Sequence, residues 1–166
     1  MDRQPGLIAE GEQVVALEDQ LAELVALRDE GSIVQIGLSH VDADQLATGL
    51  GSGVAAVSNI YSLVARDDED LLATCAAHGM AWEPYFPLGG GGGYADLPRV
   101  VDDPVVRAVA AEVGATPTQV GIAWQLAHAP VTLVIAGTSS VDHLEENVGG
   151  GDVRLPADAL ARLDAV

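Results

Sequence analysis

The sequence predicts an α/β fold in which helices alternate with the strands of a parallel sheet. Short runs rich in β-branched and aromatic residues (33–39, 54–62, 80–86 and 131–136) are separated by helix-like stretches, and this alternation is typical of β-α units. The chain has 166 residues, whereas a complete (β/α)8 barrel has about 250. Four β-α units therefore predict one domain over residues 1–166, forming half of a barrel or a small open sheet.

Signals at the helix ends set the boundaries in the first half of the chain. Residues 11–30 carry leucines at helical spacing and predict an amphipathic helix. Asp42 is a typical N-cap residue for a helix that reaches residue 50. The acidic run 67–70 favours the start of a helix because negative charge there complements the helix dipole. We expect that helix to end near Gly79.

The second half has two further helix starts before the last predicted strand. Asp103 and Pro104 begin a helix to about residue 113, since proline is tolerated at the first helical position. Residues 116–119, Thr-Pro-Thr-Gln, predict a capped start for a helix that extends to residue 128. After the strand at 131–136 we expect two short helices, at residues 142–148 and 156–165.

Composition excludes several classes of partner. Lys and Arg together number 7 against 25 Asp and Glu, so the formal net charge is −18. A surface this acidic repels nucleic acids and anionic membranes, which leaves a small-molecule ligand or substrate as the expected partner. There is no signal-peptide layout and no apolar run of about 18 residues, so we expect a cytoplasmic protein. The single cysteine, Cys75, sits in an apolar helical stretch and predicts a buried thiol without a disulfide.

Five sequence blocks occur in a fixed order between residues 23 and 147. They are 27–39 (LRDEGSIVQIGLS), 58–62 (SNIYS), 85–89 (YFPLG), 116–124 (TPTQVGIAW) and 135–147 (IAGTSSVDHLEEN). The first four are similar to the aldo-keto reductase patterns L-x-x-x-G-K-I-R-x-I-G-V-S-N, Q-N-x-Y, Y-x-P-L-G and T-P-A-Q-V-A-L-A-W. The fifth resembles the C-terminal signature of the same family. The resemblance implies the C-terminal half of a TIM (β/α)8 barrel from an NADP-dependent oxidoreductase family.

The same resemblance implies that the family's catalytic residues have no counterpart here. In the family the catalytic Asp, Tyr, Lys and His come from the first half of the barrel, and Met1 falls at or just after the fourth strand. The chain contains no lysine at all, so nothing elsewhere can replace the family's catalytic lysine. Carbonyl reduction needs a positioned general acid. We therefore expect that this chain is not an independent carbonyl reductase.

For the cofactor NADP(H), the resemblance implies contacts at both ends of the dinucleotide. At the nicotinamide end Ser39 and Tyr85 match the family, but His40 replaces an Asn and Ser58 replaces a Gln, so that end is eroded. At the adenosine end the match is fuller. The residues implied there are Gly137, Thr138 and Ser139 in a phosphate-binding turn before a helix N-terminus, His143 near the 2′-phosphate, and Glu146 and Asn147 at the adenine. As a structural alternative, Thr138 and Ser139 only cap the following helix.

Two other functions remain open at this stage. The first is a repurposed, cofactor-independent enzyme, such as a cyclase, dehydratase or isomerase. Its catalytic acid-base groups would be His40, Tyr61, Glu83 and Tyr85 at the carboxyl ends of the strands, where barrels of this type place their active sites. Tyr61 is equally well interpreted as a core residue. The second is a non-enzymatic subunit or interaction module. No metal site is expected in any of these cases.

A half-barrel creates an expectation about assembly. Four strands leave two unpaired parallel edges and expose side chains that would fill a barrel interior. We therefore expect a homodimer, in which the first strand of one copy pairs with the last strand of the other, or a separate chain that carries the N-terminal half.

Overall fold

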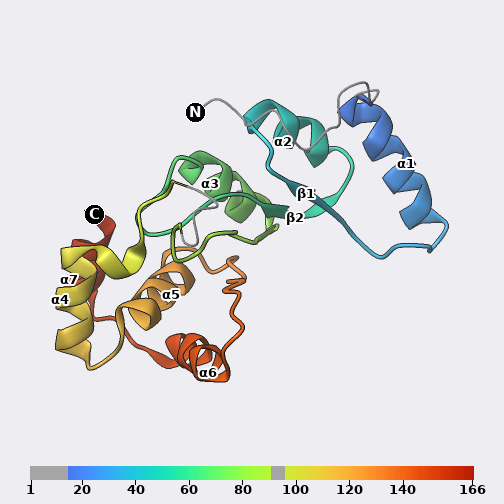
Figure 1. The fold of residues 1–166 in the computed structure, drawn as a ribbon. Helices are drawn as coiled ribbons and strands as arrows, with labels where there is room; N and C mark the ends of the chain where they lie inside the picture. The colour runs from blue at the N-terminus through green and yellow to red at the C-terminus, as the bar shows by residue number, and fades with distance from the viewer. Residues whose placement is uncertain (1–14, 91–95) are drawn as a thin grey trace.

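The computed structural model describes residues 15–90 and 96–166, and it shows an open three-stranded parallel sheet with helices around it (Figure 1). The strands are β1 (Ile36–Ser39), β2 (Val54–Ser58) and β3 (Ala81–Trp82), in that order across the sheet. Both strand pairs are parallel. Because consecutive strands are neighbours and parallel, their carboxyl ends lie at the same edge of the sheet. The predicted α/β arrangement with a parallel sheet is thus present, with three strands where four were predicted.

The described residues form seven α-helices. The first three are α1 (Leu17–Asp29), α2 (Ala43–Leu50) and α3 (Glu69–His78). The last four are α4 (Pro104–Val113), α5 (Pro117–His128), α6 (Val141–Gly149) and α7 (Ala157–Asp164). Short 3₁₀ helices occur at Val100–Asp102 and Gly150–Asp152. In Figure 1, α1 and α2 lie near β1 at one end of the molecule, and α4 to α7 gather at the other end.

The capping signals in the sequence act as predicted. The Asp42 carboxylate accepts a hydrogen bond from the backbone N–H of Gln45 at 2.9 Å, and the Gln45 side chain accepts one from the N–H of Asp42 at 3.1 Å. Thr116 and Gln119 form the same reciprocal pair at the start of α5, at 3.2 and 3.1 Å. Such a capping box satisfies two N–H groups that a helix start would otherwise leave without partners.

The predicted fourth strand at residues 131–136 is wrong as a strand. The structure contains only an isolated parallel bridge between Trp82 and Thr132. Trp82 N–H donates to the carbonyl of Val131 at 2.9 Å, and Leu133 N–H donates to the carbonyl of Trp82 at 2.8 Å. Beyond Leu133 the segment runs at the edge of a sheet whose last strand has two residues, so it has little to pair with. Leu133 and Ile135 are 54% and 49% exposed as a result.

The core lies between the sheet and the helices. Along β1 the side chains of Ile36 and Leu38 are buried, whereas Gly37 and Ser39 are exposed on the opposite face. The largest fully buried side chains are Trp82, Trp124 and Tyr61. One face of the sheet is therefore covered by helices, and the face that would line a barrel is open.

Two predictions from composition are also tested here. Cys75 is fully buried and forms no disulfide, as predicted from its apolar surroundings. None of the helices within residues 15–90 and 96–166 combines the length and hydrophobicity that a membrane span requires.

Candidate functional site

His40 and Tyr85 form a hydrogen-bonded pair at the carboxyl edge of the sheet. His40 directly follows β1, and Tyr85 lies three residues beyond β3, bridged to Ile60. The Nδ1 atom of His40 lies 2.7 Å from the phenolic oxygen of Tyr85. Burial, together with the negative charge of Asp68, raises the pKa of Tyr85. The phenol is therefore protonated at neutral pH and can donate to Nδ1 of His40 in the tautomer that leaves this nitrogen free to accept.

The backbone bends sharply at both places that supply this pair. His40 and Phe86 each have φ of +56°, a left-handed conformation that is uncommon for residues other than glycine. His40 N–H still donates to the carbonyl of Ser58 at 2.9 Å. Histidine tolerates this conformation better than most residues, but for a bulky phenylalanine it is a clear outlier. Such outliers persist where surrounding contacts hold them, and they concentrate at functional sites.

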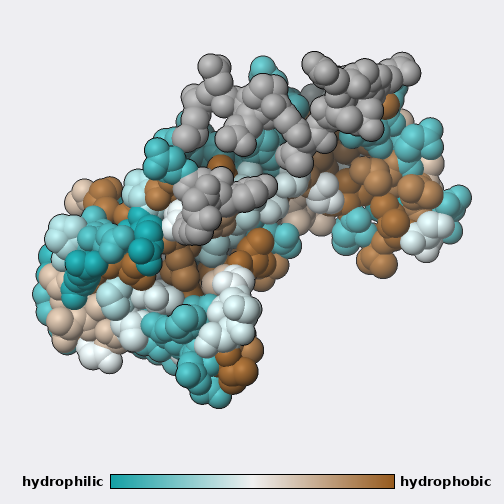
Figure 2. All heavy atoms as spheres, in the orientation of Figure 1, coloured by the Kyte–Doolittle hydropathy of each residue, from teal (hydrophilic) through white to brown (hydrophobic). Residues whose placement is uncertain are grey.

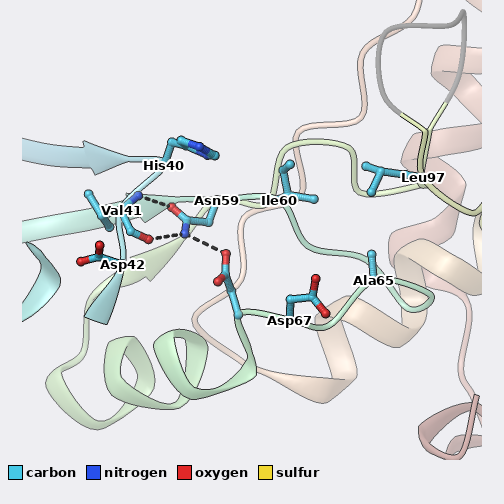
Figure 3. A pocket seen from close by; sticks show the side chains of 9 residues that line it. His40, Val41, Asp42, Asn59, Ile60, Ala65, Asp67 and Leu97 are labelled. Carbon is cyan, nitrogen blue, oxygen red and sulfur yellow. Dashed lines mark hydrogen bonds between the residues drawn. The ribbon is translucent and has the colours of Figure 1, made fainter. Parts of the chain in front are cut away.

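Asn59 supplies the contacts that hold the chain just after His40. Its side chain, 3% exposed, accepts from the backbone N–H of Val41 at 3.0 Å and donates to the carbonyl of Val41 at 2.8 Å. The same amide nitrogen donates to the Asp68 carboxylate at 2.8 Å. Figure 3 shows these three bonds converging on Asn59 beside His40. The Asn59 amide thus supplies the hydrogen bonds that a neighbouring strand would otherwise supply to the chain just beyond β1.

A small pocket of about 170 Å³ opens beside Asn59. It is lined by His40, Val41, Asp42, Asn59, Ile60, Ala65, Asp67, Asp68 and Leu97 (Figure 3). Three of these residues are aspartates, so the pocket favours neutral or positively charged groups over anions. Within the described residues, no cluster of three His, Cys, Asp or Glu side chains is arranged to hold a metal ion.

Tyr61 lies in the core and not beside His40 and Tyr85. It is 2% exposed, and its hydroxyl donates to Glu69 at 2.5 Å. Its ring meets Trp82 edge-on at 5.8 Å and stacks on Trp124 at 6.2 Å between centroids. Alternation explains this placement, because residue 61 extends the β2 segment with its side chain toward the helices. Of the two interpretations of Tyr61, the geometry corresponds to a core residue.

The contacts of Tyr61 belong to a polar cluster that the sequence pattern did not reveal. His128, at the end of α5, lies 2.7 Å from Glu69 through Nε2 and 3.6 Å from Asp164 through Nδ1. Burial alone would raise the pKa of Glu69, but hydrogen bonds from Tyr61 and His128 outweigh it and lower that pKa. Burial also raises the pKa of Tyr61, and the hydrogen bond to Glu69 adds to this. Since α3, α5 and α7 all contribute, this cluster ties three helices together.

Glu83 and Ser58 meet through the backbone. The Ser58 hydroxyl donates to the carbonyl of Glu83 at 2.8 Å, so its proton is engaged within the protein. Glu83 stands between Trp82 and Pro84, both of which are buried. Its side chain therefore points to the open face of the sheet, the face on which Ser39 is exposed. Within the described residues, the Glu83 carboxylate has no hydrogen-bond or ion-pair partner.

The turn before α6 carries the other predicted cofactor residues. Ser140 caps α6 by accepting from the N–H of His143 at 3.4 Å, and Ser140 N–H donates to the Thr138 hydroxyl at 3.1 Å. Gly137, Ser139 and the His143 side chain are exposed. The capping residue is therefore Ser140, the neighbour of the two residues proposed for that role.

Glu146 and Asn147 lie on the inner side of α6. The carbonyl of Glu146 accepts from the Gln119 side chain at 3.2 Å, and the Asn147 amide donates to the carbonyl of Ala136 at 3.5 Å. Asn147 also lines a cleft of about 380 Å³ between α5, α6 and residues 132–136. Its other lining residues are mostly apolar, among them Ile122, Leu126, Leu144 and Val148. The turn lies at the N-terminal end of α6, and the cleft runs along the same helix past Leu144, Asn147 and Val148.

An open parallel sheet with polar side chains at its carboxyl edge, and a Ser-Thr turn leading into a helix, are features expected of part of a (β/α)8 barrel. The chain belongs to the aldo/keto reductase family, whose sequence profile matches residues 7–166. It is 36% identical over 151 residues to an uncharacterized oxidoreductase of Schizosaccharomyces pombe, covering 90% of this chain and 47% of that protein. It is also 36% identical over 152 residues to pyridoxine 4-dehydrogenase of Escherichia coli, covering 91% and 51%.

Solved structures show the same fold. The fold superposes on aldose reductase from Giardia lamblia with a TM-score of 0.81 at 22% identity, over 93% of this chain and 51% of that one. An aldo-keto reductase from Klebsiella pneumoniae in complex with NADPH gives a TM-score of 0.79 at 26% identity, over 93% and 55%. The chain thus spans about half the length of the relatives that it matches.

Proposed function

We propose that this chain is the nucleotide-binding half of an aldo-keto-reductase-type oxidoreductase. It binds NADP(H) mainly through the adenosine and phosphate end, and it does not reduce carbonyl compounds by itself. The observation that carries this proposal is the turn at residues 137–140, which leads into α6 next to the cleft lined by Asn147. A relative with the same fold is known in complex with NADPH.

The groups at the turn fit an anion followed by a flat, apolar ring. The first turn of a helix directs N–H groups outward and carries partial positive charge, which favours phosphate. The bond from Ser140 N–H to Thr138 keeps the turn closed, while Ser139 and His143 stand exposed beside it. The neighbouring cleft is apolar except for Thr132 and Asn147, and the Asn147 amide suits the polar edge of an adenine.

The nicotinamide end fits less well. Tyr85 presents a half-buried ring on which a nicotinamide can stack, and Ser39 is exposed nearby. However, His40 is engaged with Tyr85, and the Ser58 hydroxyl is engaged with the backbone of Glu83. Both positions carry amide side chains in the family. We therefore expect the nicotinamide to add little to the affinity.

Tyr85 is also a poor general acid for carbonyl reduction. When bound, the cofactor would supply the hydride, and the protein must supply a proton to the carbonyl oxygen. A general acid works best when its pKa lies near the working pH, whereas burial and the charge of Asp68 raise the pKa of Tyr85. The sequence has no lysine that could lower it.

The test is a titration followed by tryptophan fluorescence and checked by calorimetry. We expect adenosine 2′,5′-bisphosphate to bind within about threefold of NADPH, a difference below about 0.7 kcal/mol, because the nicotinamide contributes little. Asn147→Ala should weaken both ligands about tenfold, the loss of roughly one hydrogen bond. Ser39→Ala, at the other end, is the matched control and should change neither.

A His143 variant distinguishes the contribution of the 2′-phosphate to binding from that of the rest of the nucleotide. His143→Ala should weaken NADPH but leave NADH unchanged if this side chain meets the 2′-phosphate. Absence of binding at millimolar NADPH would refute the proposed function.

A second candidate function is supported by the 2.7 Å contact between His40 and Tyr85. This pair, with Glu83 on the same open face, can donate and accept protons in a cofactor-independent cyclisation, dehydration or isomerisation. Turnover of a non-redox substrate that is abolished by His40→Ala and Tyr85→Phe, but unchanged by Asn147→Ala, would favour this function. If this activity survived both His40→Ala and Glu83→Gln, the assignment of these groups as its acid and base would be excluded.

A further inference from the structure

Two aromatic residues that are neighbours in the sequence, Tyr85 and Phe86, have rings in contact. The ring centroids are 5.7 Å apart and the planes are tilted by 62°, an edge-to-face arrangement. Tyr85 lies in an extended segment that is bridged to Ile60, and in extended chain successive side chains point to opposite sides. The left-handed backbone of Phe86, with φ of +56°, breaks this alternation and turns its ring back toward Tyr85.

Contacts around the following turn hold Phe86 in this conformation. Its carbonyl accepts from Gly89 N–H at 2.9 Å, and the buried side chain of Gln125 donates to the carbonyl of Pro87 at 2.6 Å. Gly89 also fits closely, because a Cβ there would lie 1.9 Å from the carbonyl oxygen of Pro98. Backbone strain persists only where the surrounding structure over-determines it, and this turn meets that condition.

The backbone of Tyr85 is fixed, but its side chain needs a separate support. Tyr85 N–H donates to the carbonyl of Asn59 at 3.0 Å, and the Tyr85 carbonyl accepts from Tyr61 N–H at 3.3 Å. These bonds fix the peptide groups and leave the side-chain torsions χ1 and χ2 to be set by other contacts. Among the described residues, the Tyr85 ring meets those of His40, at 6.4 Å between centroids, and Phe86.

The surroundings of this segment favour a fixed apolar ring. The chain that follows β3 crosses the middle of the molecule in Figure 1, and Figure 2 shows hydrophobic surface there, between the sheet and the C-terminal helices. Phe86 is half-buried. The hydrophobic effect therefore holds its ring inward, whereas the Tyr85 ring must also keep its hydroxyl on a polar partner.

We propose that Phe86 is a positioning residue, whose ring holds the Tyr85 phenol against His40 at the cost of a strained backbone. A glycine at residue 86 would adopt the same backbone without strain, but it would leave the Tyr85 ring without its edge-on neighbour. The inference rests on the site described for both candidate functions, since Tyr85 is the ring offered to a nicotinamide and a member of the acid-base pair. It requires no bound ligand.

The contact that Phe86 protects is sensitive to small movements. The Tyr85 hydroxyl lies 2.7 Å from Nδ1 of His40, and a separation of about 3.6 Å would no longer be a hydrogen bond. Because the hydroxyl is at the far end of the side chain, rotation about χ1 moves it more than any other atom of the ring. A Tyr85 ring free to rotate would therefore lose His40 before it lost its own backbone contacts.

The first test is nitrogen-15 NMR of His40 in the ligand-free protein at one fixed pH. Tyr85→Phe removes the hydroxyl and gives the Nδ1 shift of an imidazole without this partner. Phe86→Ala and Phe86→Gly should move the Nδ1 shift most of the way to that reference, whereas Phe86→Tyr keeps a ring and should retain most of the wild-type shift. Val113→Ala, which truncates a half-buried side chain on α4, is the matched control and should leave the shift unchanged.

Urea unfolding separates the positioning role from the strain. Phe86→Gly should have an unfolding equilibrium constant about fivefold smaller than Phe86→Ala, because both lack the ring and only alanine keeps the left-handed strain. The His40 shift should nevertheless be lost equally in both variants. A side chain that only fills space would make stability and the His40 shift change together.

Two results would overturn the proposal. One is a wild-type His40 shift in a folded Phe86→Gly variant, which would mean that the Tyr85 phenol is held without the ring. The other is equal stability of Phe86→Gly and Phe86→Ala, which would mean that residue 86 is not strained. If Phe86→Ala does not fold, Phe86→Leu replaces it, since leucine keeps most of the volume without a flat ring. Both readouts are taken without a nucleotide, so their failure is distinct from a failure of the NADPH titration.

Discussion

Asn59 is the residue whose removal should reveal most about how the site is held together. It is 3% exposed and makes three hydrogen bonds, two with the peptide groups of Val41 and one with the carboxylate of Asp68. In Asn59→Ala, each neutral bond is worth about 1 kcal/mol, and the bond to a partly exposed carboxylate about the same. We therefore expect a loss of about 3 kcal/mol in the free energy of unfolding, a large share of the roughly 5–15 kcal/mol of a typical domain.

Urea unfolding followed by tryptophan fluorescence measures this loss directly, and the melting temperature should fall by about 6–12 °C. Asn147→Ala is the matched control. That amide makes one long bond of 3.5 Å to Ala136, so its removal should change the free energy of unfolding by less than about 0.5 kcal/mol.

The two asparagines also differ in what they do for the site. Asn59→Ala should release the turn that follows His40 and so weaken the His40–Tyr85 contact, whereas Asn147→Ala should leave that contact intact and weaken nucleotide binding. An Asn59→Ala variant that loses less than about 1 kcal/mol would refute the reasoning, because it would mean that water replaces all three bonds.

Three other predictions follow from the ionisable groups. The pKa of Glu69 is lowered because its hydrogen bonds outweigh its burial. The ionised Glu69 carboxylate therefore stabilises the fold above the unfolded-state pKa, near 4.5. This stabilisation is lost as the pH falls through the lower folded-state pKa. The stability difference between the wild type and Glu69→Gln should shrink below about pH 4.5 in urea titrations, and a constant difference would contradict this. Asp68→Asn should lower the pKa of Tyr85, because the charge of Asp68 helps to raise that pKa. The Tyr85 titration is measured at 295 nm as the part of the signal that Tyr85→Phe removes. An unchanged midpoint would leave burial as the sole cause of the raised pKa. Cys75 is fully buried, and burial raises its pKa to about 11. It should therefore react with a thiol reagent at pH 8 only as fast as the protein unfolds. Rapid labelling of the native protein would instead show that the packing around α3 opens locally.

Helix boundaries were predictable because their causes are local. The Asp42 and Thr116 capping boxes each need only residues within three positions of one another. Both predicted caps are confirmed, and neither requires a contact with the rest of the fold. The same holds for the buried thiol of Cys75, whose apolar neighbours sit on its own helix.

Strand boundaries depended on partners that the sequence cannot show. Residues 131–136 have the composition of a strand, yet the structure gives them one bridge at Thr132. A strand exists only where a neighbour supplies hydrogen bonds, and here the neighbour, β3, has two residues. Composition therefore indicates which segments can be strands, and the tertiary arrangement decides how much of each one pairs.

The sequence by itself determined the family and the chemical inventory of the candidate site, because motifs and their order are properties of the chain. It pointed to the open-edged half-barrel, to the turn at residues 137–140, and to His40 and Ser58 as two positions that differ from the family pattern. Only the tertiary structure decided which side chains meet. It joined His40 to Tyr85, moved Tyr61 into the core with Glu69 and His128, and made Asn59 the anchor of the turn. The physical reason is that these contacts depend on the face toward which a strand residue points and on elements distant in sequence, and neither is encoded within a single motif.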